Sequence, residues 1–151
     1  MNEANREVII LIAEDDAGHA RLIEKNLNRA GLRNQIMRFD NGQTVLDFLL
    51  RNGAGTQRRS DTPYLLLLDI RMPQVDGIEV LRQLKQHQEL RKIPVIMLTT
   101  TDDPREVERC HAIGCSSYIV KPVDYDKFAE AITSLGLYLS LVKVPEINGK
   151  E

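Results

Sequence analysis

Residues 65–77 read LLLLDIRMPQVDG: four leucines lead directly into Asp69, and a proline and an Asp-Gly pair follow within this stretch. A short, continuous apolar run that ends in turn-forming residues is typical of a strand covered on both faces. Because an unpaired charge inside such a core would be costly, we expect Asp69 to lie where the strand emerges. The stretch therefore predicts a buried strand with a carboxylate at its carboxyl end.

Apolar runs and amphipathic stretches alternate along the rest of the chain. Strands are predicted at residues 8–13, 35–39, 64–68, 94–98 and 117–120. Helices are predicted to begin after Asp16, after Asp40-Asn41-Gly42, after Asp76-Gly77, at Asp103-Pro104 and at Asp124. This alternation predicts an α/β fold, an open doubly wound, five-stranded parallel sheet with helices on both faces. We expect the strand order 2-1-3-4-5.

Length and charge limit the classes of protein to which the chain can belong. With 151 residues, a net charge of −2 and a pI near 6.0, it lacks the strongly basic character of nucleic-acid-binding proteins. The apolar run at 8–13 is far shorter than the roughly 18 residues of a membrane span. We therefore expect no nucleic acid and no membrane as partner. We expect a single domain over 1–151, with a core over about 7–143 and a short tail at 144–151.

The cysteines and histidines are assigned no direct role. Cys110 and Cys115 are too few for a disulfide scaffold and predict the reduced thiols of a cytoplasmic protein. His111 beside Cys110 is interpreted as ordinary helix packing, because a metal site needs more ligands. His19 and His87 have no partner nearby in the sequence, and we interpret both as surface residues.

Polar side chains follow the predicted strands at their carboxyl ends. They are Glu14 and Asp15 after the first strand, Asp69 after the third, Thr99 after the fourth and Lys121 after the fifth. The carboxyl ends of parallel strands meet at one edge of an open α/β sheet, where such folds bind ligands. At about 4 Å and an effective dielectric near 20, each pair of carboxylates costs on the order of 4 kcal/mol, so the cluster needs a cation or a raised pKa. A set of oxygen ligands alone favours Mg²⁺.

A carboxylate beside Mg²⁺ and a lysine is a site for phosphoryl transfer onto that carboxylate. In this interpretation Asp69 attacks phosphorus, while Lys121 and Thr99 meet the charge on the equatorial oxygens. Each residue alone also has a structural explanation, since Asp15, like Asp16, is suited to capping a helix, and a single lysine or threonine is common on a surface. Their joint occurrence at four strand ends favours the functional interpretation.

Four motifs together resemble the receiver domain of response regulators in bacterial two-component systems. They are AEDD (13–16), LLLLDIRMPQVDG (65–77), PVIMLTT (94–100) and YIVKP (118–122), and they occur in the family's order over nearly the whole chain. The resemblance implies a regulator rather than an enzyme. It would accept a phosphoryl group on Asp69 from a sensor histidine kinase and assist its own phosphorylation and dephosphorylation. Only a few residues follow the last predicted helix, so we expect no output domain and a signal that leaves through the receiver surface.

The resemblance also implies roles for the residues of the cluster. Mg²⁺ would be held by Glu14, Asp15, Asp69 and the main-chain carbonyl of Arg71. Lys121 and Thr99 would contact the phosphoryl group, and Tyr118 would be an aromatic switch that turns inward as Thr99 shifts. For Tyr118, a half-buried strand tyrosine is the structural alternative. The first acid is Glu14 where many relatives have Asp, and Thr100 stands where alanine is common.

Within that family, the chain resembles the stand-alone regulators that are partnered with phytochrome-type kinases. The resemblance lies in the polar connection at 53–63, in residues 87–100 and in a last helix that runs into residues 138–145. Residues 53–63 are polar and aperiodic, which predicts a solvated loop.

The last predicted helix, which begins at Asp124, is apolar on more than one face. Its inner stripe consists of Phe128, Ala131, Ile132, Leu135, Leu139 and Val142. Leu137, Tyr138 and Leu141 lie off this stripe, and exposed apolar area of that kind often marks an interface. We therefore predict a helix whose outer face forms a homodimer or docks a partner. Two alternatives stay open: the helix end folds back and covers itself, or Gly136 and the alternation from Leu137 to Leu141 produce a short strand.

Three other functions share parts of this pattern. A Mg²⁺-dependent phosphohydrolase uses the same aspartyl phosphate, but such enzymes usually carry a second acid two residues later, where this chain has Arg71. An unphosphorylated interaction scaffold would not need the complete set of acids, threonine and lysine. A nucleotide-binding fold would need a Gly-rich phosphate loop, and the GAG at 53–55 lies in a predicted loop after a helix.

Overall fold

The computed structural model describes residues 8–148, and at its centre is a parallel sheet in the order β2-β1-β3-β4-β5. The strands are β1 (Ile9–Ala13), β2 (Ile36–Phe39), β3 (Thr62–Leu68), β4 (Val95–Thr99) and β5 (Ser117–Val120). The helices are α2 (Ala17–Arg29), α3 (Gly42–Leu50), α4 (Gly77–Gln86), α5 (Pro104–Ile113) and α6 (Tyr125–Leu139), with a 3-10 turn, η1 (Leu90–Lys92), before β4. The predicted α/β fold and its strand order are confirmed.

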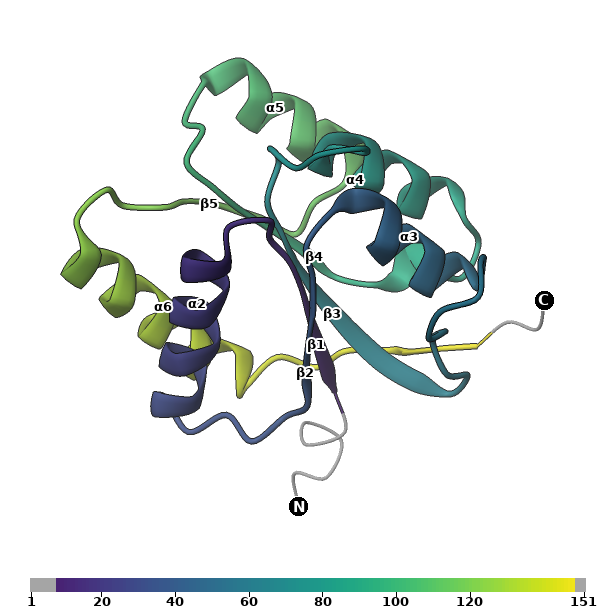
Figure 1. Cartoon of the computed structure of the whole chain (residues 1–151), viewed down its shortest axis with the longest axis horizontal. Coiled ribbons are helices and arrows are strands. Elements are labelled where there is room, and N and C mark those ends of the chain that lie inside the picture. Colours follow the sequence, from purple (N-terminus) through teal and green to yellow (C-terminus); the bar gives the residue numbers. More distant parts are fainter. Residues whose placement is uncertain (1–7, 149–151) are drawn as a thin grey trace.

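The helices form two layers, one on each side of the sheet (Figure 1). Helices α3, α4 and α5 cover one face, where they pack on strand residues such as Leu11 and Leu66. Helices α2 and α6 cover the other face and pack on residues such as Ile10 and Leu67. Because successive side chains of a strand point to opposite faces, the continuous apolar runs supply both cores. Within residues 8–148, no helix has the length and apolar character needed to cross a bilayer.

Each of the five α-helices within residues 8–148 begins at a side-chain cap. The caps are Asp16 for α2, Asn41 for α3, Asp76 for α4, Asp103 for α5 and Asp124 for α6. In each case a side-chain oxygen accepts a backbone N–H from the first turn, as Asp16 does from His19 at 3.0 Å. Such a cap satisfies a donor that the helix leaves free and contributes about 1 kcal/mol. The caps thereby define where each strand-to-helix loop ends.

The register of the sheet aligns the carboxyl ends of its central strands. Ala13 of β1 pairs with Leu68 of β3, and Thr99 of β4 pairs with Val120 of β5. The residues that follow these pairs, Asp69 among them, therefore leave the sheet at the same edge, as expected for parallel strands.

The C-terminal segment departs from the prediction of a long last helix. Helix α6 ends at Leu139, and the chain then runs to the start of β3, where it forms a short sixth strand, β6 (Glu146–Ile147) (Figure 1). β6 pairs antiparallel with β3, and Ile147 is fully buried. A continued helix would carry this apolar side chain away from the core, so its burial favours the crossing. Val142 accordingly packs on the core from the crossing segment rather than from the helix, and the core extends beyond residue 143.

Most of the polar connection before β3 is exposed, as predicted, but one of its arginines is buried. Arg58 is only 3% exposed, and its Nε donates to the carbonyl of Leu49 at 2.9 Å. The next N–H, that of Arg59, donates to the hydroxyl of Tyr64 at 2.9 Å. A loop that is polar in sequence is thus held against α3 and β3 by hydrogen bonds of its own residues.

Candidate functional site

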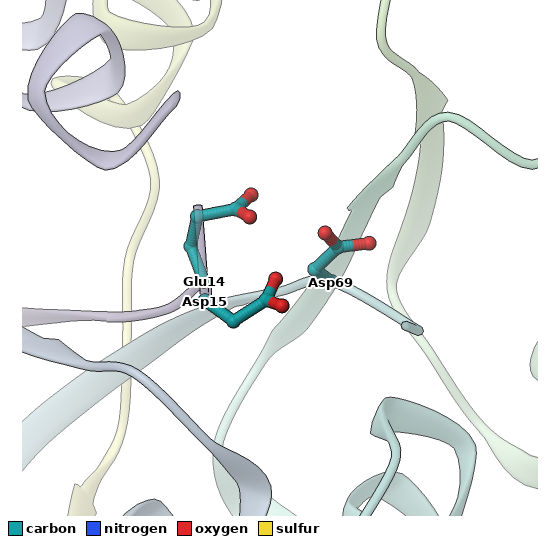
Figure 2. Close-up of side chains that lie close together, drawn as sticks. All are labelled: Glu14, Asp15 and Asp69. Carbon is teal, nitrogen blue, oxygen red and sulfur yellow. The ribbon is translucent and has the colours of Figure 1, made fainter. Parts of the chain in front are cut away.

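Three carboxylates meet at the carboxyl edge of the sheet. Glu14 and Asp15 follow β1 and Asp69 follows β3, and one oxygen of each side chain lies within 4.8 Å of the other two. Figure 2 shows the carboxylates of Glu14 and Asp15 directed toward Asp69 from the neighbouring strand end. Glu14 is 2% exposed and Asp69 is 8% exposed, whereas Asp15 is open to solvent. The predicted acidic cluster is therefore present, with two of its members buried.

Lys121 follows β5 and brings an ammonium group into this cluster. Its Nζ lies 3.2 Å from Oδ2 of Asp69 and also forms an ion pair with Oε1 of Glu14. The N–H of Lys121 donates to the carbonyl of Thr99 at 2.6 Å, which ties the strand end to β4. Buried charges are tolerated when they are paired in this way. One ammonium facing three carboxylates still leaves the ionised site with an excess of negative charge.

The pKa of Glu14 reflects both the burial of its carboxyl group and the charges around it. Burial raises the pKa of Glu14 from 4.5 to about 7, although the hydrogen bond and the charge of Lys121 lower it, and the charge of Asp69 raises it further. A buried carboxyl group that lacks enough positive charge around it suits a cation. The three acids offer oxygen ligands only, which are the ligands of a hard divalent cation such as Mg²⁺. The residues present therefore fit such an ion.

Thr99 places a hydroxyl group at the same edge, at the end of β4. The residue is fully buried, and within residues 8–148 its Oγ1 has no hydrogen-bond partner. Leaving a buried hydroxyl unpaired costs about 1–3 kcal/mol. The hydroxyl is therefore available to a group from outside the described part of the chain.

The turn after β3 holds the backbone of Asp69. The N–H of Asp69 donates to the carbonyl of Ala13 at 3.0 Å, and the N–H of Gly77 donates to the carbonyl of Ile70 at 2.7 Å. A Cβ at position 77 would lie 2.0 Å from the carbonyl oxygen of Asp69, so only glycine permits this approach. The Asp-Gly pair of the opening stretch thus has two functions: Asp76 caps α4, and Gly77 lets the helix begin directly against the Asp69 backbone.

Two predicted residues lie around the loop that follows Thr99. Arg71 is exposed, and its Nε donates to Oγ1 of Thr101 at 3.3 Å; the role of its main-chain carbonyl stays a prediction. Tyr118 is half-buried on β5, and its hydroxyl donates to the carbonyl of Thr101 at 2.7 Å. Burial raises the pKa of Tyr118 to about 12, so the phenol remains a donor at neutral pH. Both side chains fasten the segment after β4.

His19 belongs to the site, which corrects its interpretation as a surface residue. Its ring is half-buried in the first turn of α2, and its Nδ1 lies 3.1 Å from Nζ of Lys121. The ring also packs edge-on against Phe128 of α6, with 5.4 Å between centroids. The sequence gives only a weak signal for this role, which is that His19 lies about one helical turn after Glu14 and Asp15. His87 is only partly exposed as well, and its Nδ1 accepts backbone N–H groups at the start of η1.

Comparisons with known proteins agree with this geometry. Residues 10–133 match the family described as the response regulator receiver domain. A response regulator receiver domain from Rhodospirillum rubrum is 45% identical, with a TM-score of 0.88 over 93% of this chain and 99% of that chain.

Two further relatives are regulators with a bound ion or a phosphoryl group. Response regulator Rcp1 from Synechocystis is 30% identical over 95% of this chain and 97% of its own length. The structure of its Mn(2+)-bound form gives 27% identity and a TM-score of 0.82 over 91% of this chain and 98% of that chain. The phosphorylated cyanobacterial phytochrome response regulator RcpA is 25% identical, with a TM-score of 0.78 over 91% of this chain and 97% of that chain.

Proposed function

The chain belongs to the response regulator receiver domain family, and we propose that it is a phosphorylation-dependent signalling switch whose phosphoacceptor is Asp69. The observation that carries the assignment is the surroundings of this carboxylate. Asp69 is nearly buried at the end of β3, with the ammonium group of Lys121 at 3.2 Å. The hydroxyl of Thr99, which has no hydrogen-bond partner among residues 8–148, belongs to the end of the adjacent strand. The ammonium group beside Asp69 and the hydroxyl on the neighbouring strand end are the donors that a phosphoryl group on Asp69 would require.

In the proposed reaction, an oxygen of Asp69 attacks the phosphorus of a phosphohistidine on a sensor histidine kinase. The new O–P bond forms as the P–N bond of the donor breaks, and the electron pair leaves with the imidazole. Lys121 stays protonated and donates an N–H to one phosphoryl oxygen, while the Thr99 hydroxyl donates to another. Because these donors are in place beforehand, the chain assists its own phosphorylation, and hydrolysis of the acyl phosphate by water uses the same donors.

We assign the cation site to Glu14, Asp15, Asp69 and the main-chain carbonyl of Arg71, with Mg²⁺ as the ion. A cation bound there supplies positive charge that offsets the negative phosphoryl oxygens. The contribution of the chain is to hold one oxygen from each of three carboxylates within 4.8 Å of the others. The Mn(2+)-bound form of Rcp1 supports a divalent cation by analogy.

We propose a phytochrome-type sensor histidine kinase as the phosphoryl donor. The support is the likeness to RcpA, which is a cyanobacterial phytochrome response regulator. Transfer from such a kinase should be faster than transfer from an unrelated sensor kinase at equal concentration. The proposal places the reaction in the cytoplasm, and the free thiols of Cys110 and Cys115 agree with a reducing compartment.

We propose that residues 99–103 and Tyr118 convert phosphorylation into a changed surface. A phosphoryl group adds about −1.5 to −2 charges. When the Thr99 hydroxyl turns toward it, the backbone that follows moves, and the bond from Tyr118 to the Thr101 carbonyl is strained. Release of that bond lets the ring turn inward. A two-state element of this kind is what a phosphorylation switch needs.

We propose that the outer face at the end of α6 forms a homodimer. Leu137, Tyr138 and Leu141 are 56%, 58% and 77% exposed, and the side chain of Tyr138 borders a groove along β5 that Ile119 also lines. Three exposed apolar side chains this close in the sequence favour burial against a second copy. Sedimentation should show a dimer that Tyr138→Lys dissociates. A monomer both with and without an acyl-phosphate analogue would reject this proposal.

Labelling by acetyl phosphate tests the proposed function. With Mg²⁺, the wild type should gain the mass of one phosphoryl group, and Asp69→Asn should gain none. Asp76→Asn, which keeps the helix cap on the same loop, is the matched control and should be labelled like the wild type. Absence of label on the wild type, or equal label on Asp69→Asn, contradicts the proposal. Sustained release of phosphate from small phosphate esters would instead favour a phosphohydrolase.

A further inference from the structure

The ammonium group of Lys121 is held by three contacts. Its Nζ contacts Oε1 of Glu14 and lies 3.2 Å from Oδ2 of Asp69 and 3.1 Å from Nδ1 of His19. An ammonium group has three N–H donors, so each donor has one acceptor. The Lys121 side chain is only 1% exposed, so bulk water does not compete for these donors. The three contacts therefore define the direction of the group.

The contact with Lys121 also determines the role of the His19 ring. Because an ammonium group donates and never accepts, Nδ1 of His19 is the acceptor of this contact. Phe128 packs edge-on against the ring at 5.4 Å and 84°. The backbone N–H of His19 is bound to the side chain of Asp16 at 3.0 Å. His19 is thus an acceptor that is fixed at both its ring and its backbone.

His19 differs from the other two acceptors in the proposed reaction. Asp69 becomes an acyl phosphate, and Glu14 is a proposed cation ligand, so phosphorylation changes both. His19 has neither role, and its contact with the ammonium group is the one that the reaction leaves unaltered. We propose that His19 is a positioning residue for Lys121, which holds the ammonium group so that a freed N–H points at the phosphoryl oxygen. This inference rests on the proposed function and concerns a residue that acts through Lys121 rather than on phosphorus.

The flexibility of lysine explains why such an anchor matters. The ammonium group sits on a four-carbon stem with several rotatable bonds, so it moves when its contacts change. Charge on the phosphoryl oxygens is stabilised best by donors that are oriented in advance. Loss of one hydrogen bond to a charged group should therefore slow phosphorylation roughly tenfold.

Two substitutions distinguish the effect of the acceptor atom of His19 from the effect of the packing of its ring. His19→Asn places a side-chain oxygen where Nδ1 lies, since both are the first atom beyond Cγ, and it should keep the labelling rate within about threefold of the wild type. His19→Leu keeps an apolar contact with Phe128 but has no acceptor, and it should be labelled about tenfold more slowly. His111→Leu, which removes an exposed histidine of α5, is the control and should not change the rate. The rates are measured by intact mass at saturating acetyl phosphate and Mg²⁺.

Calorimetric titration with Mg²⁺ distinguishes positioning of Lys121 from damage to the cation site. The dissociation constant should be the same in wild type and His19→Leu; a change as large as that in the rate would overturn the inference. Labelling of His19→Leu at the wild-type rate, or of His19→Asn as slowly as His19→Leu, would also overturn it and leave the proposed function intact. A wild type that takes no label at all overturns both.

Discussion

Replacing Glu14 by glutamine should stabilise the metal-free protein at alkaline pH. The carboxyl group is 2% exposed, and burial raises its pKa from 4.5 to about 7. A carboxyl group with a raised pKa binds its proton more tightly in the folded chain than in the unfolded chain. Its contribution to stability is therefore present below about pH 4.5 and is lost as the pH rises through about 7. The neutral amide avoids that loss.

The size of the effect follows from the difference between the two pKa values. At about 1.4 kcal/mol per pH unit, the interval from 4.5 to about 7 corresponds to roughly 3 kcal/mol. The amide accepts only a weaker hydrogen bond from Lys121, and this reduces the increase in the free energy of unfolding. We therefore expect the free energy of unfolding of Glu14→Gln to exceed that of the wild type by roughly 1–3 kcal/mol at pH 8. The excess should fall toward zero at pH 5, where the wild-type carboxyl group is protonated.

Urea unfolding in EDTA, followed by circular dichroism at pH 8 and at pH 5, measures this difference. Glu24→Gln, at an exposed position of α2, is the control and should change the free energy of unfolding by less than about 0.5 kcal/mol at both pH values. A Glu14→Gln variant that is less stable than the wild type at pH 8 would contradict the raised pKa of Glu14. A difference in stability that is the same at both pH values would also contradict it.

Three further substitutions test the site and the fold. Thr99→Val removes a buried hydroxyl that has no partner in the described part of the chain, so thermal unfolding should show unchanged or higher stability while labelling by acetyl phosphate slows. Gly77→Ala places a Cβ 2.0 Å from the Asp69 carbonyl oxygen, so it should lower the free energy of urea unfolding by about 2–4 kcal/mol and reduce labelling. Gly55→Ala, with open space around it, should change neither the stability nor the labelling. Ile147→Ala empties a buried position of β6 and should lower the free energy of unfolding by about 2–4 kcal/mol. Leu141→Ala, at a position that is 77% exposed, should change it by less than about 0.5 kcal/mol, and equal effects of the two substitutions would contradict the role of β6.

The sheet was predictable because each of its five parallel strands leaves a local signal. Runs such as 8–13 and 64–68 are continuously apolar because both faces of the sheet are covered. The order of these runs along the chain and the helices that connect them are then enough to predict the arrangement of the strands. β6 leaves no such signal, since two residues are too few for a pattern. It forms because the start of β3 offers a free edge and because Ile147 reaches the core, and both conditions are set by the tertiary structure. The end of α6 is ambiguous for a related reason: the pattern at residues 137–141 favours a helix but also permits a short strand.

The residues of the candidate site also divide into those with a local signal in the sequence and those placed by tertiary packing. Glu14, Asp69 and Lys121 were found because each directly follows a strand, and parallel strands end at one edge. His19 was missed because it lies on a helix, where its neighbour is decided by the packing of α2 on α6 and by the reach of the Lys121 side chain. The burial of Arg58 has no signal in the sequence, because composition shows that a loop is polar but not which surface the loop packs against.

The most direct test of the central claim is the chemical identification of the phosphorylated residue. After incubation with acetyl phosphate and Mg²⁺, borohydride reduces an aspartyl phosphate to homoserine, and mass spectrometry of the peptides locates the change. We expect homoserine to replace aspartate at position 69, within the stretch 65–77, and at no other acid. Modification of Glu14, Asp15 or a histidine with Asp69 intact would contradict it.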